Sequence, residues 1–361
     1  MHLERLELVD FRNYARAEFT LTPRTTAVVG RNGQGKTNFV EGLAYLSLLG
    51  SFRGAPAEAL VRVGAEQAVI RATIRQPDGR ESLVEAELNR NGRNRFLVNR
   101  QRLQRSRDAL GALRVSVFSP DDLALVKDGA GERRRFLDDA LVTLAAKNDA
   151  LRLDFERALK QRNALLKQAG GRLDEAAAVT LDVWDARVAD LGERIGYARA
   201  TLVARLGPLV ADSYRTLAGG NHEVTLVYAP AWRSIGLAAA LDASRTDDVR
   251  RQLSTVGPHR DELDLGINGL PARTHASQGE QRTLALALRL GTHRLVCDVV
   301  DDVPVLVLDD VLSELDEERA TALLTSLPDG QVIITTAGTL PDQAKPELTL
   351  RIEAGRVVDA T

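Results

Sequence analysis

The sequence predicts an α/β fold assembled from the N- and C-terminal parts of the chain, with a mainly helical domain inserted between them. Near the N-terminus an apolar strand, residues 26–29, runs into a glycine-rich loop that a helix follows. Near the C-terminus a second apolar strand, residues 305–308, ends in two aspartates. Between them, residues 132–169 contain neither glycine nor proline, and their apolar residues recur at helical spacing. Strands alternating with helices on both sides of a helical stretch are typical of an interrupted α/β domain.

Length and composition fit a water-soluble globular protein. The 361 residues suffice for two or three domains, of which we expect two. Apolar residues make up 44% of the chain and charged residues 27%, which excludes a disordered or collagen-like protein. No apolar stretch approaches the roughly 18 residues needed to cross a bilayer. The N-terminal segment, residues 1–7, carries charged side chains where the apolar region of a signal peptide would lie. We therefore expect a cytoplasmic protein with no membrane partner.

Strands dominate the first third of the chain and return near its end. Four apolar or alternating runs predict strands at residues 3–9, 26–29, 68–74 and 83–88. Asn91-Gly92 predicts a two-residue hairpin turn, because both turn positions need a positive φ. Strands and helices alternate again from about residue 255, and Ala354-Gly355 predicts a last hairpin over residues 348–358. We expect the two outer parts to form one sheet.

Helices fill the middle of the chain. One long helix is expected over residues 132–169, where Gly170-Gly171 ends it. A second is expected from about Leu181 to Gly207-Pro208, and together they suggest an antiparallel helical arm. The expected domains are a discontinuous head, residues 1–120 and 250–361, and an arm, residues 121–249.

The loop between the first buried strand and its helix has the spacing of a phosphate-binding loop, Gly30-x-x-x-x-Gly35-Lys36-Thr37. Its glycines let backbone N–H groups converge on phosphate oxygens, and the helix N-terminus favours negative charge. Lys36 would reach the β- and γ-phosphates, and the Thr37 hydroxyl would bind Mg²⁺. The pattern therefore predicts an ATP site, with an ordinary glycine turn as the alternative.

The second buried strand ends at Asp309 and Asp310. In a nucleotide site Asp309 would complete the magnesium shell, and Asp310 would orient or deprotonate the attacking water. The alternative is a core strand followed by polar loop residues.

A third motif, Ser277-Gln-Gly279-Glu280, precedes a long apolar helix. Ser277 with Glu280 three residues later forms a capping box, which is common and carries no chemistry by itself. The capped start of a helix is also an anion site, so both interpretations are compatible.

These three motifs, taken in order, resemble the ATP-binding head of ABC-type ATPases, and Asn38 and Phe11-Arg12-Asn13-Tyr14 resemble its SMC/Rad50/RecF branch. Finer matches resemble the RecF family over almost the whole chain, weakest over the helices at 140–220. These matches are Ser51-Phe52-Arg53-Gly54, Ser119-Pro-Asp-Asp-Leu, Arg133-Arg-Arg-Phe-Leu-Asp138 and Gly257-Pro-His-Arg-Asp261. The resemblance implies an ABC-type, SMC/Rad50-like head with a helical insertion.

The resemblance also implies roles for single residues. Catalytic roles would fall to Lys36, Asp310 and Ser277. Nucleotide contacts would come from Arg12, Gly30, Arg31, Asn32, Gly33, Gln34, Gly35, Lys36, Thr37, Asn38, Ser277, Gly279 and Asp316. Ser277 and Gly279 would cap the γ-phosphate of an ATP held by a second copy, and Asp316 would lie at the dimer seam. ATP would thereby close a homodimer on gapped DNA, and the protein would help load recombinase with RecR and RecO.

Three positions depart from the ABC-type pattern. Asp310 stands where glutamate is usual, and its shorter side chain reaches the water only with an adjusted backbone. Thr336 stands where a switch histidine is expected, and Phe118-Ser119-Pro120 stands where a glutamine is sought. We therefore expect a weak, DNA-stimulated ATPase that acts as a switch.

Residues 90–107 form a basic run with seven arginines and no acidic residue. Six of these arginines are candidate DNA contacts: Arg93, Arg95, Arg100, Arg102, Arg105 and Arg107, with Phe96 available for packing. The run equally suits a solvated edge hairpin whose charges deter strand pairing, and both interpretations stay open. A second cluster, Arg133-Arg134-Arg135, lies at a helix start, where it needs a nearby anion: DNA, nucleotide or an acidic side chain.

Three other functions are alternatives to a DNA clamp. An ABC transporter ATPase fits poorly with Asn38, Asp310, Thr336 and the helical insertion. A Rad50-like tether needs a long coiled coil and a zinc hook, which one modest insertion and the single cysteine, Cys297, cannot supply. A small-molecule kinase would leave the Ser277 motif as a plain helix cap.

Overall fold

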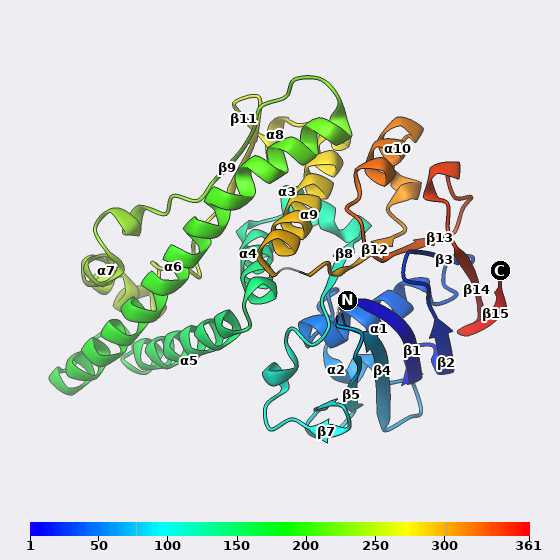
Figure 1. The fold of residues 1–361 in the computed structure, drawn as a ribbon. Helices are drawn as coiled ribbons and strands as arrows, with labels where there is room; N and C mark the ends of the chain where they lie inside the picture. Colours follow the sequence, from blue (N-terminus) through cyan, green and yellow to red (C-terminus); the bar gives the residue numbers. More distant parts are fainter. Residues whose placement is uncertain (77, 301) are drawn as a thin grey trace. The chain divides into compact units, whose positions relative to one another are not determined.

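The computed structural model describes residues 1–76, 78–300 and 302–361 (Figure 1). The chain divides into two compact units, the first comprising Met1–Leu123, Asp212–Asn221 and Gln278–Thr361, the second Ala124–Ala211 and His222–Ser277. This division differs from the expected boundary at 249/250, because strand β10 (Asp264–Ile267) pairs with β9 (Val224–Val227) and so lies with the helical part. The last residues of α6 (Glu175–Ala218) belong to the first unit, where Asp212 accepts a hydrogen bond from Arg294.

The first unit contains a mainly parallel six-stranded sheet in the order β15-β14-β3-β13-β12-β8. Its strands are β3 (Thr25–Val29), β8 (Val115–Phe118), β12 (Val305–Asp309), β13 (Val332–Thr336), β14 (Leu348–Glu353) and β15 (Arg356–Ala360). β3 pairs in parallel with β13 on one side and β14 on the other, and β12 pairs in parallel with β8. The N- and C-terminal parts of the chain therefore share one sheet, as expected.

A second, antiparallel sheet in this unit has the order β2-β1-β4-β5-β6-β7. Its strands are β1 (His2–Phe11), β2 (Tyr14–Thr20), β4 (Gln67–Arg75), β5 (Glu81–Asn89), β6 (Arg95–Val98) and β7 (Gln101–Arg102). β4 buries every second side chain, from Ala68 to Ile74, as a strand with one face on a core must. Helix α1 (Lys36–Leu48) contributes Phe39, Leu43 and Leu46 to the core that both sheets share.

Both sequence-predicted hairpins are present, but the expected two-residue turn at Asn91-Gly92 was wrong. β5 and β6 pair in antiparallel register with Glu87 opposite Arg95, which puts residue 91 at the centre of the connection, and Gly92 has a positive φ of 118° whereas Asn91 does not. β14 and β15 flank Ala354 and Gly355, whose φ values of 46° and 72° are those of a type I′ turn.

Besides α1 and the end of α6, the first unit contains one long helix, α9 (Gln278–Val300), and two shorter ones, α2 (Ala57–Leu60) and α10 (Glu317–Ser326). Single 3₁₀ turns lie at Ser106–Ala109, Pro120–Leu123, Leu312–Glu314 and Asp342–Ala344. Along the described residues, no helix is both long enough and apolar enough to span a membrane.

The second unit is mainly helical. It contains α3 (Ala124–Lys127), α4 (Ala130–Leu144), α5 (Lys147–Gln168), most of α6, α7 (Leu237–Arg251) and α8 (Ala272–His275), with a 3₁₀ turn at Ala231–Ser234. A small sheet of β9, β10 and β11 (Leu270–Pro271) completes it.

The expectation of one helix over residues 132–169 was wrong, because α4 ends before α5 begins. Ala145 is extended, with φ −157° and ψ 116°, and the side-chain amide of Asn148 donates to the carbonyl of Leu141 at 2.7 Å. The same carbonyl also accepts from the backbone N–H of Ala145 at 3.0 Å, so two hydrogen bonds close the end of α4 at the break. The expected end of the next helix was also wrong: α6 continues through Pro208.

Helices α5 and α6 pack antiparallel, as expected for an arm. Phe155 early in α5 shares a cluster with Ile195, whereas Leu166 late in α5 clusters with Leu181 early in α6. Between these clusters the fully buried Arg162 donates to Asp185 at 2.5 Å and to Asp248 of α7 at 2.7 Å. A buried guanidinium without such partners would strongly destabilise the fold, so these contacts fix the three helices together.

The arginine cluster at the start of α4 has acidic partners within its own unit. Arg133 makes two hydrogen bonds to the carboxylate of Glu262, at 2.7 and 2.9 Å, and Arg135 pairs with Glu132. Arg134 donates to the carbonyl of Asp261. Acidic and backbone groups thus compensate for cations at a helix N-terminus, and no external anion is needed.

We predict that acid weakens the first unit partly through His293 of α9. Burial lowers the pKa of His293 to about 4, from an ordinary value near 6.5, and its Nδ1 lies 2.9 Å from the Ser116 hydroxyl. As pH falls from about 6.5 to 4, the unfolded chain gains a proton that the folded chain does not, so the free energy of unfolding falls by up to about 3 kcal/mol. Urea denaturation between pH 4 and 7 measures this slope.

The variant His293→Asn keeps a polar partner for Ser116 and should flatten the slope over that pH window. Replacement of the exposed His275 by asparagine is the matched control and should leave the slope as it is in the wild type. An unchanged slope for His293→Asn would contradict the prediction.

Candidate functional site

The glycine-rich loop occupies residues 30–35, between the end of β3 and the start of α1. Gly33 and Gly35 have φ values of 78° and 124°, which side chains rarely allow. A Cβ atom on Gly30 would lie 2.4 Å from the carbonyl oxygen of Ile352, so the neighbouring strand leaves room for glycine alone. The motif's glycines are therefore demanded by the local backbone.

Lys36 begins α1 with its side chain turned back over the loop. Its Nζ donates to the carbonyls of Gly30 at 2.8 Å and Arg31 at 3.2 Å, and the residue is 6% exposed. Burial lowers the pKa of Lys36, while the nearby charges of Asp310 and Asp309 oppose this shift. The ammonium group thus lies inside the loop that would surround a phosphate, where its charge would attract one.

A set of side chains outside the motif braces the loop. The Tyr14 hydroxyl donates to the carbonyl of Gly35 at 2.8 Å, and the Asn13 amide donates to the carbonyl of Gln34 at 2.9 Å. Asn38 in turn donates to the Asn13 side-chain oxygen at 2.8 Å. Asn13, Tyr14 and Asn38 therefore hold the loop in shape before any ligand binds.

The C-terminal hairpin braces the same loop from its other end. The backbone N–H of Gly355 donates to the carbonyl of Gln34 at 3.0 Å, and that of Ala354 donates to the Gln34 side chain at 2.6 Å. Gln34 is thus held from both ends of the chain.

Arg12 lies at the turn between β1 and β2 with a φ of 53°. Its guanidinium makes a two-point ion pair with the fully buried Glu41 of α1, at 2.8 and 2.9 Å, and donates to the carbonyl of Ala59. Ser51 also donates to Glu41, at 2.5 Å. These contacts anchor α1, and a nucleotide contact from Arg12 stays a prediction.

Asp309 lies at the end of β12, next to β13, and is 3% exposed. Its Oδ1 accepts a hydrogen bond from Thr335 at 2.6 Å and one from Thr37 at 3.5 Å. Burial raises the pKa of this carboxyl, and the two hydroxyls oppose the shift. A hydroxyl and a carboxylate at this separation offer the hard oxygen ligands that Mg²⁺ prefers.

No cluster of three or more metal-ligating side chains occurs among the residues that the structure describes. Mg²⁺ at nucleotide sites is usually held by one or two carboxylates together with phosphate oxygens. Thr37 and Asp309 therefore fit the metal expected here.

Asp310 adopts the left-handed conformation, with φ 55°. Its backbone N–H donates to both the carbonyl and the hydroxyl of Thr335, each at 3.1 Å, and Ser313 donates to its carboxylate at 3.1 Å. The backbone of Asp310 therefore departs from ordinary strand and helix geometry, and its water-orienting role stays a prediction. The sequence did not single out Thr335, because its position relative to the aspartates depends on the register of two strands distant along the chain.

Thr336, at the expected histidine position, has contacts of another kind. Its carbonyl accepts from the N–H of Gly30 at 3.3 Å, and its hydroxyl accepts from that of Gly338 at 3.1 Å. Both join β13 to neighbouring backbone.

The Ser277 motif lies at the start of a helix, as expected. α9 begins at Gln278, and Ser277 is exposed and directly precedes it. Arg319 of α10 donates to the Asp316 carboxylate at 2.9 Å, and a Cβ atom on Gly279 would lie 3.3 Å from the same guanidinium. Gly279 and Asp316, predicted as parts of one seam, therefore both lie against Arg319.

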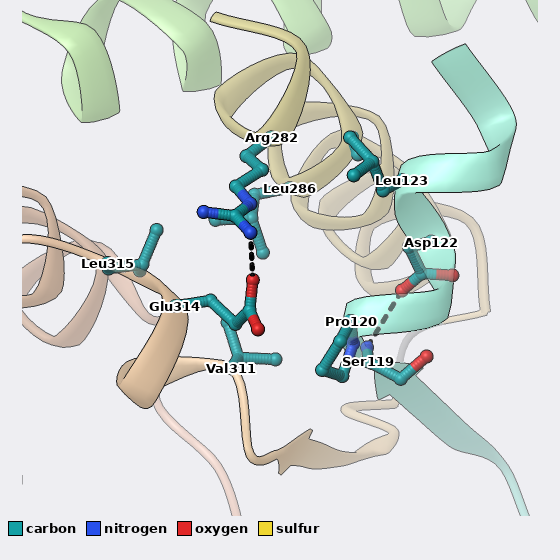
Figure 2. Close-up of a pocket in the computed structure, with 10 residues that line it drawn as sticks. Ser119, Pro120, Asp122, Leu123, Arg282, Leu286, Val311, Glu314 and Leu315 are labelled. Carbon is teal, nitrogen blue, oxygen red and sulfur yellow. Dashed lines mark hydrogen bonds and ion pairs between the residues drawn. The ribbon is translucent and has the colours of Figure 1, made fainter. Parts of the chain in front are cut away.

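A small cavity of about 30 Å³ lies between residues 119–123, α9 and the loop after β12 (Figure 2). Figure 2 shows Arg282 of α9 pointing toward Glu314 on one wall. Their charged groups lie 2.5 Å apart. On the opposite wall Asp122 accepts from the backbone of Ser119 at 2.8 Å and pairs with Arg289 of α9 at 2.6 Å. α9 is thus tied to the segment where a glutamine was sought and to the loop that follows the paired aspartates.

The basic run extends from the connection between β5 and β6, through β6 and β7, to the 3₁₀ turn at Ser106–Ala109. Five of its six candidate arginines are exposed and Arg107 is half-buried, and within the described residues only Arg95 has an ion-pair partner, Glu87 at 3.6 Å. Arg90 instead donates to backbone carbonyls, including that of Arg62 at 2.9 Å. Phe96 is 3% exposed and stacks on Tyr45, so the expectation that it is available for outside packing was wrong.

Comparison with known proteins decides the family. The family model for the RecF/RecN/SMC N terminal domain matches residues 2–343. The protein described as DNA replication and repair protein RecF from Streptomyces avermitilis is 45% identical over 352 residues, 93% of each chain. Its counterpart from Kineococcus radiotolerans is 43% identical over 369 residues, covering 95% of this chain and 94% of the other.

The chain belongs to the RecF family. A solved structure described as the recombination mediator protein RecF-ATPrS in the RecFOR pathway superposes with a TM-score of 0.91 at 28% identity, covering 99% of this chain and 98% of that one. The Smc head domain from Pyrococcus furiosus, at 16% identity and a TM-score of 0.58 over 100% and 96% of the two chains, shares the fold.

These matches confirm the expected fold class, an ABC-type, SMC/Rad50-like head with a helical insertion. Membership of the RecF family argues against two of the alternative functions, a transporter ATPase and a small-molecule kinase.

We predict that Tyr14→Phe weakens nucleotide binding about fivefold, because the loop loses one buried hydrogen bond worth about 1 kcal/mol. Titration of the purified chain with a fluorescent ATP analogue measures this. Tyr45→Phe is the matched control: it removes a hydroxyl from a buried tyrosine of α1 that contacts Asn94 at 3.5 Å, remote from the loop. Equal affinities for Tyr14→Phe and the wild type would show that the brace does not shape the site.

Proposed function

We propose that this chain is an ATP-dependent DNA-binding protein of recombinational repair and replication restart. ATP closes two copies into a clamp on gapped DNA, the clamp helps load recombinase together with RecR and RecO, and slow hydrolysis releases it. The observation that carries this proposal is the composite arrangement of the Lys36 loop and the paired aspartates in a chain of the RecF family.

ATP and Mg²⁺ are supported by the geometry of the loop. The Lys36 side chain lies within the loop, and the N-terminus of α1, with its backbone N–H groups, directly follows the loop. Thr37 lies beside Asp309. Relatives described as RecF-ATP and RecF-ATPrS superpose closely on this chain. Magnesium would neutralise charge on the phosphates, while Thr37 and Asp309 hold it.

Slow hydrolysis is supported by the groups around Asp310. We assign Asp310 the water-orienting role, with a carboxylate held near the chain by its short side chain and by Ser313. Thr336 adds no imidazole at the adjoining strand end. A site with fewer groups to stabilise the transition state suits a timed switch.

Dimerisation is supported by the exposure of the Ser277 motif. A hydroxyl at the start of a 23-residue helix, with the N–H groups and dipole of that helix behind it, suits an anion presented from outside. We propose that this anion is the γ-phosphate held by a second copy, with Gly279 beside Ser277 and Asp316 at the seam.

DNA contact is supported by the arginines of the basic run. The arginines at 93, 100, 102 and 105 are exposed and have no acidic partner in the described part of the chain. Four such positive charges are more than protection of a sheet edge needs. We propose that they bind backbone phosphates.

We predict that Lys36→Met and Ser277→Arg both abolish ATP-dependent dimerisation, for different reasons. Lys36→Met removes a charged contact to phosphate, so nucleotide affinity should fall at least tenfold. Ser277→Arg should leave nucleotide affinity unchanged and block the partner's γ-phosphate. Analytical ultracentrifugation with a non-hydrolysable ATP analogue, together with nucleotide titration, separates the two effects.

The matched control is Ser234→Arg, which adds the same charge at an exposed serine of the second unit. It should dimerise normally. If Ser277→Arg dimerises with ATP, the trans role of Ser277 is wrong, and if the wild type stays monomeric, the clamp itself is wrong.

We predict that Arg100→Ala and Arg102→Ala each lower DNA affinity and reduce the slope of log K against log salt by about 0.9, since each would release one counterion fewer. Fluorescence anisotropy on gapped DNA at several salt concentrations measures the slope. Arg24→Ala, at an exposed arginine elsewhere in the first unit that lies 3.8 Å from Glu347, should leave the slope unchanged. Unchanged slopes for both test variants would favour the edge-protection alternative.

A further inference from the structure

Thr335 is a fully buried residue near the end of β13, and its hydroxyl contacts both paired aspartates. It donates to Asp309 Oδ1 at 2.6 Å and accepts from the backbone N–H of Asp310 at 3.1 Å. The same hydroxyl therefore donates to one residue and accepts from the next one along the chain.

The parallel pairing of β12 with β13 creates this arrangement. Asp309 lies opposite Thr335 in the register, and both strands run toward the same edge of the sheet. A β-branched side chain on a central strand has few rotamers, so the hydroxyl is held in place without further contacts. The Asp309 oxygen that it contacts is also the one nearest Thr37, at 3.5 Å.

We propose that Thr335 is a positioning residue that orients Asp309 toward the metal and holds Asp310 in its left-handed conformation. Through the first contact it holds Asp309 with Oδ1 beside Thr37, and through the other it accepts from the backbone N–H of Asp310. This inference rests on the proposed function, because it concerns the magnesium and the hydrolysis assigned to this site.

Removal of the hydroxyl should weaken the metal site more than the fold. Hydrogen bonds from outside the ligand set commonly contribute 10- to 100-fold to metal affinity. The backbone N–H of Asp310 keeps its second partner, the carbonyl of Thr335, so the loop retains a hydrogen bond when the hydroxyl is lost.

The test compares Thr335→Val, which preserves shape, with Thr335→Ser, which preserves the hydroxyl. Electron paramagnetic resonance measures Mn²⁺ affinity in the presence of a non-hydrolysable ATP analogue. We expect Thr335→Val to lose about tenfold in Mn²⁺ affinity and Thr335→Ser to stay near the wild type. Nucleotide affinity measured in EDTA should be the same for all three, and kcat should fall in Thr335→Val with little change in KM.

Thr26→Val is the matched control. Thr26 is also fully buried, on the adjoining strand β3, and its hydroxyl contacts Thr22 at 3.2 Å instead of the aspartates. This variant should lower the thermal unfolding temperature and leave Mn²⁺ affinity unchanged. If Thr335→Val does not fold, Thr335→Ala removes the same hydroxyl without adding volume.

Two results overturn the inference. The first is that Thr335→Val, or Thr335→Ala in its place, binds Mn²⁺ as tightly as the wild type. The second is that Thr26→Val loses as much Mn²⁺ affinity as Thr335→Val. If the wild type itself fails to bind Mn²⁺ with the ATP analogue, the proposed function fails together with the inference.

Discussion

The parallel pairing of β3 with β13 and β14 is the constraint on which the rest of the first unit depends. It joins a strand from residues 25–29 to strands beyond residue 330, so neither end of the chain can form this sheet alone. Parallel strands end at the same edge, and that edge gathers Lys36, Thr37 and Asp309 although more than 270 residues separate the last two. The same pairing brings the final hairpin against Gln34 of the loop.

The loop itself shows how much of a short motif is held from outside. Gly33 and Gly35 provide the unusual backbone angles, but Tyr14, Asn13 and the last hairpin decide which loop shape is stable. A loop fixed before the ligand arrives loses less conformational entropy on binding. Asn38, which the sequence offered only as a family resemblance, acts through Asn13 and thus belongs to this support.

The arginines of this chain fall into two groups. Buried or half-buried arginines such as Arg12, Arg133 and Arg162 are matched by carboxylates, which is how a fold holds charges away from water. In the first unit most arginines between residues 93 and 107 remain exposed without such partners among the described residues. A cation that stabilises no internal contact is available for an external anion, and this contrast separates structural arginines from candidate DNA contacts.

The sequence by itself determined the fold class, the two hairpins, the phosphate-loop spacing and the strand that ends in paired aspartates, since each follows from local periodicity or turn chemistry. It did not reveal the break at Ala145, where the Asn148 side chain and the Ala145 backbone both donate to Leu141, nor the longer connection at Asn91-Gly92, nor the burial of Phe96 against Tyr45. Only the tertiary structure placed Thr335 on Asp309 and β10 beside β9, because strand register between distant segments leaves no trace in either segment alone.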